Sequence, residues 1–290
     1  MENKFEPETQ KIRTEAAAEI IEQRRIDRIR GVDYASDYSR TRGLLEYTNN
    51  LQGLTNYLAY IRSLPFRKGL LLDIGSGSTK AMAELSTAED LSYNLAIKAT
   101  SLAIDKDARQ NLGREKIVIT NAESLRGIKD AEVSGAISVF SIGHSAAPEL
   151  VAKSIDRVLV PSGAFKSVFS ENPENIDNGK WSERHKRLIK SFRDMGYSLA
   201  LSDIEGVNFS NEPLITTVML AIKKPVVGIS AHKLLDLDRE TYKTQISELI
   251  SRGHKPITEA LEEKHGSIEE RKNTIRLERE LQALLDDDEF

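Results

Sequence analysis

The sequence has no cysteine among its 290 residues, which excludes disulfide bonds, thiolate zinc sites and cysteine nucleophiles. It has no apolar run approaching the roughly 20 residues that a helix needs to cross a bilayer. Its first residues lack the apolar core of a signal peptide. A net charge of −4 gives no overall basic character, so nucleic-acid binding is left open but not favoured. We therefore expect a cytoplasmic protein with no membrane partner.

The chain divides into three regions by its composition and periodicity. Residues 1–63 are predicted to be a helical extension, residues 64–225 alternate strands with helices, and residues 226–290 are predicted to be helical again. One helix of the first region is predicted from apolar residues spaced three and four apart, namely Leu51, Leu54, Leu58 and Ile61. The terminal helices offer surfaces for a protein partner or for self-association.

The middle region contains seven candidate strands. They are residues 69–74, 100–105, 116–120, 135–140, 164–169, 198–204 and 214–222. Strands that alternate with helices predict a mostly parallel sheet with right-handed crossovers. Such a sheet binds ligands beyond the carboxyl ends of its strands, at the point where the strand order reverses.

The most informative stretch is LLLDIGSGSTK, which begins at Leu70. An apolar strand ends near Asp73, and a turn that contains Gly75 and Gly77 leads into a helix. Glycine has no Cβ, so such a turn can adopt unusual backbone angles and let a ligand approach the main chain. The start of the helix adds unpaired N–H groups and a partial positive charge. The stretch indicates a nucleotide-type cofactor, although a lone Gly-x-Gly also occurs in structural α/β proteins.

Further signals follow in order along the chain. Asp105 ends the next predicted strand, where a carboxylate can accept both hydrogens of a ribose diol; it could instead be a surface residue that caps the next helix. Asn121 begins an Asn-Ala-Glu-Ser-Leu segment after the third strand and could also be a simple turn residue. A helix, a turn from Pro161 to Gly163 and another strand come next.

Taken in this order, these features resemble the class I S-adenosylmethionine-dependent methyltransferases over about residues 64–225. The resemblance implies an α/β fold with a seven-stranded, mostly parallel sheet flanked by helices, the Rossmann-like methyltransferase fold, with helical N- and C-terminal extensions. It implies a closing hairpin whose last strand is antiparallel. It also implies a transferase that uses S-adenosyl-L-methionine as its cofactor.

The same resemblance implies contacts at the methionine end of the cofactor. Asp73, Gly75, Ser76 and Gly77 would cradle the methionine portion, and Ser141, at the end of the fourth strand, would face the reacting methyl group. These residues come from two loops that parallel strands place at one edge of the sheet.

At the nucleoside end, the resemblance implies that Asp105, with Lys106 beside it, holds the ribose hydroxyls. Asn121 and Ala122 would border the adenine, with the Asn121 side chain or the Ala122 N–H reading its edge.

Two departures from the family pattern stand out. Thr79 occupies the position of the family's third glycine, which would stiffen the loop. Asp73 and Asp105 lie farther apart than the ~20 residues expected between such a fingerprint and its acidic partner. We attribute the excess to a longer first helix or to an insertion around residues 86–93, and Asp107 is the alternative ribose ligand.

His144 follows the fourth strand, where it could accept a proton from an attacking oxygen or nitrogen or form a hydrogen bond within a loop. Tyr34, Tyr38 and Arg40 precede the domain. By resemblance they belong to a lid that contacts the substrate; the alternative is packing of the N-terminal helices on the sheet. The other histidines, His185 among them, are expected to be solvated, and no metal site is predicted.

We therefore expect a methyl transfer to an O or N nucleophile, most simply of a small molecule because the chain lacks basic character. Since the sulfonium already activates the methyl group, the protein mainly needs to align the reactants and exclude water. An RNA or protein acceptor remains open, as do a non-catalytic methyltransferase-like interaction module and a nicotinamide-dependent enzyme with a similar glycine turn.

Overall fold

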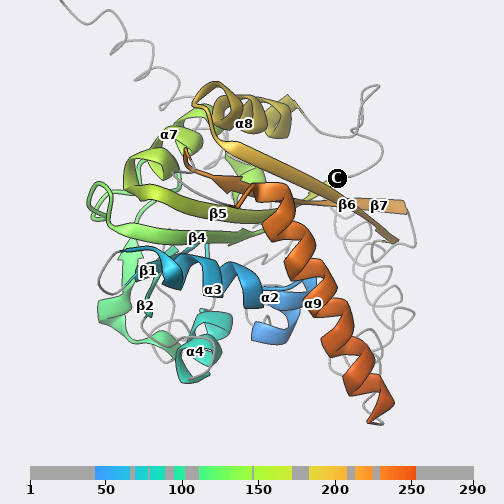
Figure 1. Ribbon diagram of the computed structural model, residues 1–290. Coiled ribbons are helices and arrows are strands. Elements are labelled where there is room, and N and C mark those ends of the chain that lie inside the picture. The colour runs from blue at the N-terminus through green and yellow to red at the C-terminus, as the bar shows by residue number, and fades with distance from the viewer. Residues whose placement is uncertain are drawn as a thin grey trace, which may run out of the picture.

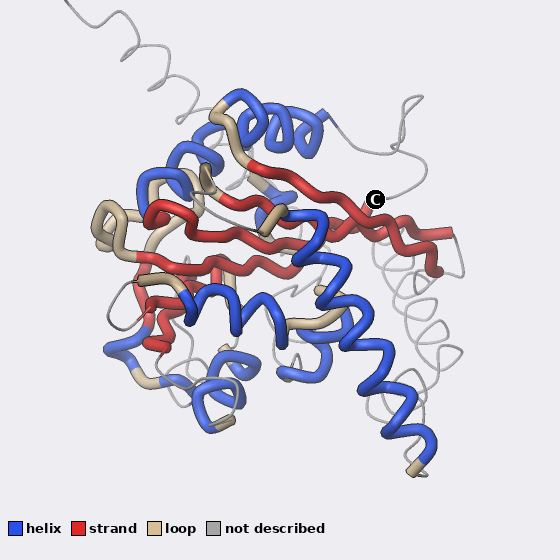
Figure 2. The backbone as a smooth tube through the Cα atoms, in the orientation of Figure 1, coloured by secondary structure: helices blue, strands red, loops and turns tan. Residues whose placement is uncertain are grey.

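A seven-stranded sheet lies between two layers of helices in the computed structural model (Figures 1 and 2). The structure describes residues 43–65, 69–77, 79–88, 95–101, 111–145, 147–171, 183–207, 213–224 and 229–252. The strands are β1 (Gly69–Ile74), β2 (Leu95–Ser101), β3 (Ile117–Ile119), β4 (Val133–Val139), β5 (Leu159–Glu171), β6 (Ser198–Val207) and β7 (Pro213–Ile222). The α-helices are α2 (Leu44–Asn50), α3 (Thr55–Ser63), α4 (Lys80–Thr87), α7 (Pro148–Val158), α8 (Glu183–Asp194) and α9 (Ala231–Ser251). Two 3-10 helices are η1 (Arg114–Lys116) and η2 (Ile142–His144).

The strand order is β3-β2-β1-β4-β5-β7-β6. Strands β1 to β5 pair in parallel, whereas β7 is antiparallel to both β5 and β6. The fold class, the closing hairpin and its antiparallel last strand are therefore confirmed. The order reverses between β1 and β4, which places the ligand-binding position of such a sheet beyond the carboxyl ends of these two strands.

The two strands at the reversal point are buried throughout. Every residue of β1 and of β4 is buried, as expected for central strands that helices cover on both faces. This is why β1 is mostly apolar and β4 contains only apolar, glycine and serine residues, and why their positions could be predicted closely. Their burial gives a rigid base for the loops that follow Ile74 and Val139.

The prediction for the second strand was wrong in its bounds. β2 spans Leu95–Ser101 and pairs with β1 in the register Asp73↔Ala99, so Asp105 does not end it. The apolar residues after Ser101 suggested a later strand, while the half-buried Lys98, which contacts Glu132, interrupts the apolar pattern of the real one. The eight-residue α4 is not a longer first helix, and residues 88–94 separate it from β2.

The predicted turn from Pro161 to Gly163 is an irregularity inside β5 rather than a separate turn. α7 ends at Val158 and β5 begins at the next residue. Ser162 has a φ of 62°, and the pairing of β4 with β5 shifts register at this point. Hydrogen bonds to Lys223 keep the bulged segment within the sheet, which explains why the strand continues through it.

One face of the sheet is covered by α2, α3, α4 and α9 (Figure 1). The helix predicted from Leu51 to Ile61 begins only at Thr55, as α3, because the chain turns at Gly53 with a φ of 99° after α2 has ended. The four apolar residues that predicted it are nevertheless all buried in this core. The first half of α9 also packs here, through Ala231, Leu234 and Leu235.

The other face is covered by α7 and α8 and contains most of the aromatic packing. Phe165 and Phe192 stack with ring centroids 5.7 Å apart, and Tyr197 meets Phe192 edge-on at 5.0 Å. His185 of α8 packs against Phe169 at 4.5 Å and is buried, so the expectation that it is solvated was wrong. None of the helices in the described ranges is both long and apolar enough to cross a membrane.

Candidate active site at the reversal point

The turn after β1 has the geometry expected of a loop that meets a ligand with its main chain. Asp73 is fully buried, whereas Gly75, two residues later, is exposed. Gly75 and Gly77 have φ values of 74° and 55°, the left-handed region that glycine enters at little cost. The N–H of Ser76 donates to the Thr100 carbonyl at 3.1 Å, which ties the turn to the end of β2.

Thr79 also adopts the left-handed conformation, with a φ of 59°, directly before α4. This is unfavourable for a β-branched residue and is the conformation that a glycine would take without cost. Its N–H donates to the Ser76 carbonyl and its own carbonyl accepts from Ala83, so the turn and the helix hold it in place. Thr79 therefore holds a backbone conformation that is typical of glycine at this position.

The loop after β4 lies against the loop after β1. Ser141 donates its hydroxyl hydrogen to the Ile74 carbonyl at 2.6 Å, and the Ser138 hydroxyl lies 2.5 Å from that of Ser141. A Cβ placed on Gly75 would lie 2.5 Å from the Ser141 Oγ, so only glycine fits there. Phe140, next to Ser141, has a φ of 54°. The structure thus brings Ser141 to the glycine turn, with its hydroxyl held by β1.

Tyr47 of α2 contacts Asp73, just before the glycine turn. Its hydroxyl donates to Oδ2 of Asp73 at 3.1 Å, and both side chains are buried. Sequence analysis missed this residue, because nothing in the local pattern of α2 distinguishes Tyr47 from a core tyrosine.

A buried ion pair lies on the same face of the sheet. Lys166 of β5 and Asp238 of α9 have no exposed side-chain surface, and Nζ and Oδ2 are 2.7 Å apart. Burial disfavours the ammonium and lowers the pKa of Lys166, while the Asp238 carboxylate opposes this shift. Sequence analysis missed this pair as well, although a lysine inside the apolar run of β5 is a visible signal.

The Asn121 side chain closes a turn. Its Oδ1 accepts hydrogen bonds from the N–H of Ser124 at 3.1 Å and from the Ser124 hydroxyl at 2.5 Å. The turn role left open in the sequence is therefore observed, and the adenine role stays a prediction for Asn121 and for the half-buried Ala122. A polar cavity of about 420 Å³ lies beside this segment, lined by residues that include Glu123, Arg126 and Arg157.

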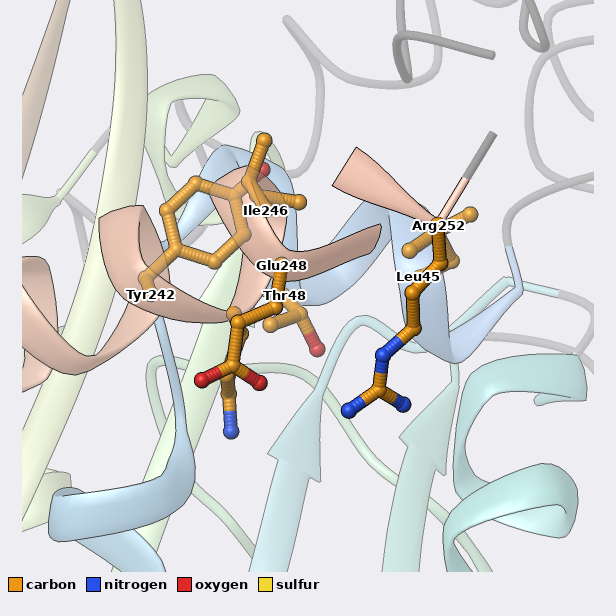
Figure 3. Close-up of a pocket in the computed structure, with 7 residues that line it drawn as sticks. Leu45, Thr48, Tyr242, Ile246, Glu248 and Arg252 are labelled. Atoms are coloured by element: carbon orange, nitrogen blue, oxygen red, sulfur yellow. The ribbon is translucent and has the colours of Figure 1, made fainter. Parts of the chain in front are cut away.

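A second cavity of about 280 Å³ lies between α2 and the far end of α9 (Figure 3). Leu45 and Thr48 of α2 face Tyr242, Ile246 and other residues of α9 across it. Among the described residues, none in the loops after β1 or β4 lines this cavity, so it is distinct from the glycine turn at the reversal point.

Several predicted site residues lie outside the described part of the chain: Tyr34, Tyr38, Arg40, Asp105 and Lys106, together with the alternative ribose ligand Asp107. His144 ends η2, which puts its backbone just beyond β4 at the predicted sheet edge. Among the described residues, no group of His, Asp and Glu could hold a metal ion.

The residues at the reversal point fit a cofactor of the S-adenosylmethionine type. Asp73 offers a buried carboxylate for an ammonium group, and the exposed glycine turn offers main-chain groups. The turn leads directly into α4, whose first N–H groups point toward the same edge.

Residues 72–166 match the sequence model of a protein family described as a methyltransferase domain. The matched range runs from β1 to β5 and includes both loops at the reversal point. This part of the chain is therefore a methyltransferase domain, built on the sheet described above. The predicted family, the predicted enzyme class and S-adenosyl-L-methionine as the cofactor are thereby confirmed.

Solved structures of several methyltransferases resemble this methyltransferase chain at low sequence identity. A 1,6-didemethyltoxoflavin-N1-methyltransferase of Burkholderia thailandensis is 18% identical, with a TM-score of 0.49, covering 72% of this chain and 89% of its own. A phosphoethanolamine N-methyltransferase of Haemonchus contortus is 13% identical, with a TM-score of 0.48, covering 69% and 58% respectively. A search of curated protein sequences found no match.

Proposed function

We propose that this methyltransferase transfers a methyl group to an O or N nucleophile of a small molecule. The observation that carries the proposal is the buried Asp73 followed by left-handed Gly75 and Gly77 at the point where the strand order reverses. The net charge of −4 favours a small acceptor over RNA, because nucleic-acid binding requires a basic surface that neutralises phosphates.

In this proposal the loop after β1 binds the methionine end of the cofactor. Asp73 receives the ammonium group, while Gly75, Ser76 and Gly77 present main-chain groups to it. Ser141 packs against the same turn, where the Ile74 carbonyl holds its hydroxyl, and is proposed to face the reacting methyl group. The rigid contact between the two loops keeps these groups in place before the ligand arrives, which lowers the entropic cost of binding.

Asp105 and Lys106 are proposed to hold the ribose, and Asn121 and Ala122 to border the adenine. The turn that Asn121 closes with Ser124 supports this proposal, because it fixes the main chain of the segment that would border the adenine.

The cofactor, when bound, supplies a methyl group that its sulfonium centre activates for transfer. The chain's own part is to align the acceptor with that group and to exclude water. We propose that His144 accepts the proton of the O or N nucleophile. Tyr34, Tyr38 and Arg40 are proposed to contact the acceptor.

Calorimetric titration with S-adenosylmethionine and S-adenosylhomocysteine tests the cofactor site. We expect binding by the wild-type chain and an affinity at least about tenfold lower for Asp73→Asn, because the variant loses a charged partner for the ammonium. Asp194→Asn is the matched control, since Asp194 is an exposed residue of α8 on the far sheet face. Absence of binding by the wild-type chain would instead indicate a non-catalytic interaction module.

The acceptor class requires a separate experiment. A screen with cofactor labelled in its methyl group, applied to fractionated metabolites, RNA and protein, should transfer label to the metabolite pool. Label in RNA or protein alone would refute the small-molecule proposal while leaving the cofactor site intact.

A further inference from the structure

The buried pair of Lys166 and Asp238 needs an explanation beyond stability. Both side chains are fully buried, and removing two charges from water costs about as much as their attraction returns. Apolar residues of similar volume often stabilise a fold equally well or better. The groups that the pair holds in place suggest its role.

The pair fixes the turn between α2 and α3. Nζ of Lys166 donates to the Gly53 carbonyl at 2.8 Å as well as to Asp238. Oδ1 of Asp238 accepts from the N–H groups of Asn56 at 2.7 Å and Tyr57 at 3.1 Å. These N–H groups belong to the first turn of α3 and have no acceptor within their own helix. One ion pair therefore holds both sides of the turn.

The turn at Gly53 also fixes the position of α2. The N–H of Gly53 donates to the carbonyl of Thr48 at 2.8 Å. A helix of seven residues is too short to be stable by itself, so the position of α2 comes from its contacts. Its other end is held by Glu84 of α4, whose Oε2 accepts from the N–H of Leu44 at 2.6 Å.

We propose that the Lys166–Asp238 pair is a positioning device for the cofactor site. By fixing the turn at Gly53 it sets the position of α2, which carries Tyr47. The Tyr47 hydroxyl, 3.1 Å from Oδ2 of Asp73, then orients that carboxylate toward the ammonium of the cofactor. This inference rests on the proposed function, because it takes Asp73 as a cofactor ligand.

A double-mutant cycle read out by binding of S-adenosylhomocysteine to the full chain tests this link. Tyr47→Phe removes only the hydroxyl, and Lys166→Met removes the charge that fixes the turn. We expect each single variant to bind about tenfold more weakly than the wild type. The double variant should bind no more weakly than the weaker single variant, because both changes break one chain of contacts.

Tyr197 and Lys223 provide matched controls. Both contact Asp156: the Tyr197 hydroxyl donates to its Oδ1 at 3.0 Å, and the Lys223 ammonium lies 3.3 Å from the same atom. These residues lie where β6 begins and β7 ends, at the edge opposite the glycine turn. Tyr197→Phe and Lys223→Met should therefore leave the affinity for S-adenosylhomocysteine unchanged.

Asp238→Asn keeps the test valid if Lys166→Met does not fold. It preserves the shape of the side chain but weakens the bond to Lys166 and the acceptor for Asn56 and Tyr57. We expect weaker binding of S-adenosylhomocysteine and, without any ligand, faster amide hydrogen exchange at Asn56 and Tyr57.

The possible results separate the two proposals. If the wild-type chain does not bind S-adenosylhomocysteine, the proposed function fails. If it binds, and the folded Lys166→Met or Asp238→Asn variant binds equally well, the positioning role is wrong and the proposed function stands. Additive losses in the double variant, or equal losses in the Tyr197 and Lys223 controls, would also overturn the positioning role.

Discussion

The two faces of the sheet are held by different kinds of contact. On the face under α7 and α8, aromatic rings connect the helices to the sheet, with Phe192 in contact with Phe165 and Tyr197. The face under α2, α3 and α9 is crossed by buried polar contacts, among them the Lys166–Asp238 pair. Apolar contacts are tolerant of small shifts, whereas hydrogen bonds depend on distance and angle. We infer that the first face mainly supplies stability and the second mainly positions the cofactor site.

Tyrosine hydroxyls illustrate the polar face. Tyr57 belongs to α3, and its hydroxyl lies 2.8 Å from the Ala136 carbonyl and 3.0 Å from that of Ala164, so it bridges β4 and β5. Burial raises the pKa of Tyr57 well above its ordinary value, as does the negative charge of Asp238, so it remains a donor. Tyr60 donates to the Ser162 carbonyl at the bulge of β5.

The largest effect on stability is expected from the aromatic face. Phe192→Ala should lower the free energy of unfolding by about 4 kcal/mol, because it leaves a cavity among fully buried rings. Denaturant unfolding measures this loss. The affinity of the folded fraction for S-adenosylhomocysteine should not change. A large loss of affinity would show that the aromatic face also positions the cofactor site.

The next effect is expected from the polar face. Lys166→Met should lower the free energy of unfolding by about 3 kcal/mol, because Asp238 is left buried without its cation. Unlike Phe192→Ala, it should also weaken cofactor binding in protein that is still folded. Unfolding and calorimetry on the same samples compare the two. Equal affinity for both folded variants would remove the distinction between the faces.

The smallest effect is expected from the ion pair between α7 and α8. Glu149 contacts Arg187, and both side chains are more than one-third exposed. Glu149→Gln should therefore lower the free energy of unfolding by at most about 1 kcal/mol. A loss as large as that of Lys166→Met would contradict the expectation that a buried ion pair affects stability more than an exposed one.

The Glu149 contribution should also depend on pH. Partial burial opposes the charge of Glu149, but hydrogen bonds from Arg187 outweigh this and lower its pKa below the ordinary 4.5. Because the folded pKa is the lower one, the contribution is complete above pH 4.5 and is lost as the pH falls through the folded value. The free energies of unfolding of the wild type and of Glu149→Gln, measured at a series of pH values, should converge in acid.

The sequence predicts the parts of this fold that depend on local patterns. β1 and β4 contain almost no charged residues because helices bury both faces. The glycine turn after Asp73 is visible because its left-handed backbone favours glycine. β2 was misplaced because pairing with β1, rather than its own hydrophobicity, decides its bounds.

The contacts around the site could not be predicted in the same way. Tyr47 reaches Asp73, and Lys166 reaches Asp238, only after the sheet and α9 have formed. Such pairs leave no spacing pattern in the sequence. Lys166 is a partial exception, since a charge within a strand that is buried on both faces requires a partner. Sequence patterns therefore indicate where the cofactor site lies, but not what holds it in shape.

A crystal structure of the chain with S-adenosylhomocysteine would test the central claim most directly. We predict that the amino-acid end of the ligand lies against the main chain of Gly75 and Gly77, with Asp73 facing its ammonium group and Ser141 beside the glycine turn. A ligand bound elsewhere, for example in the cavity between α2 and α9, would contradict the account.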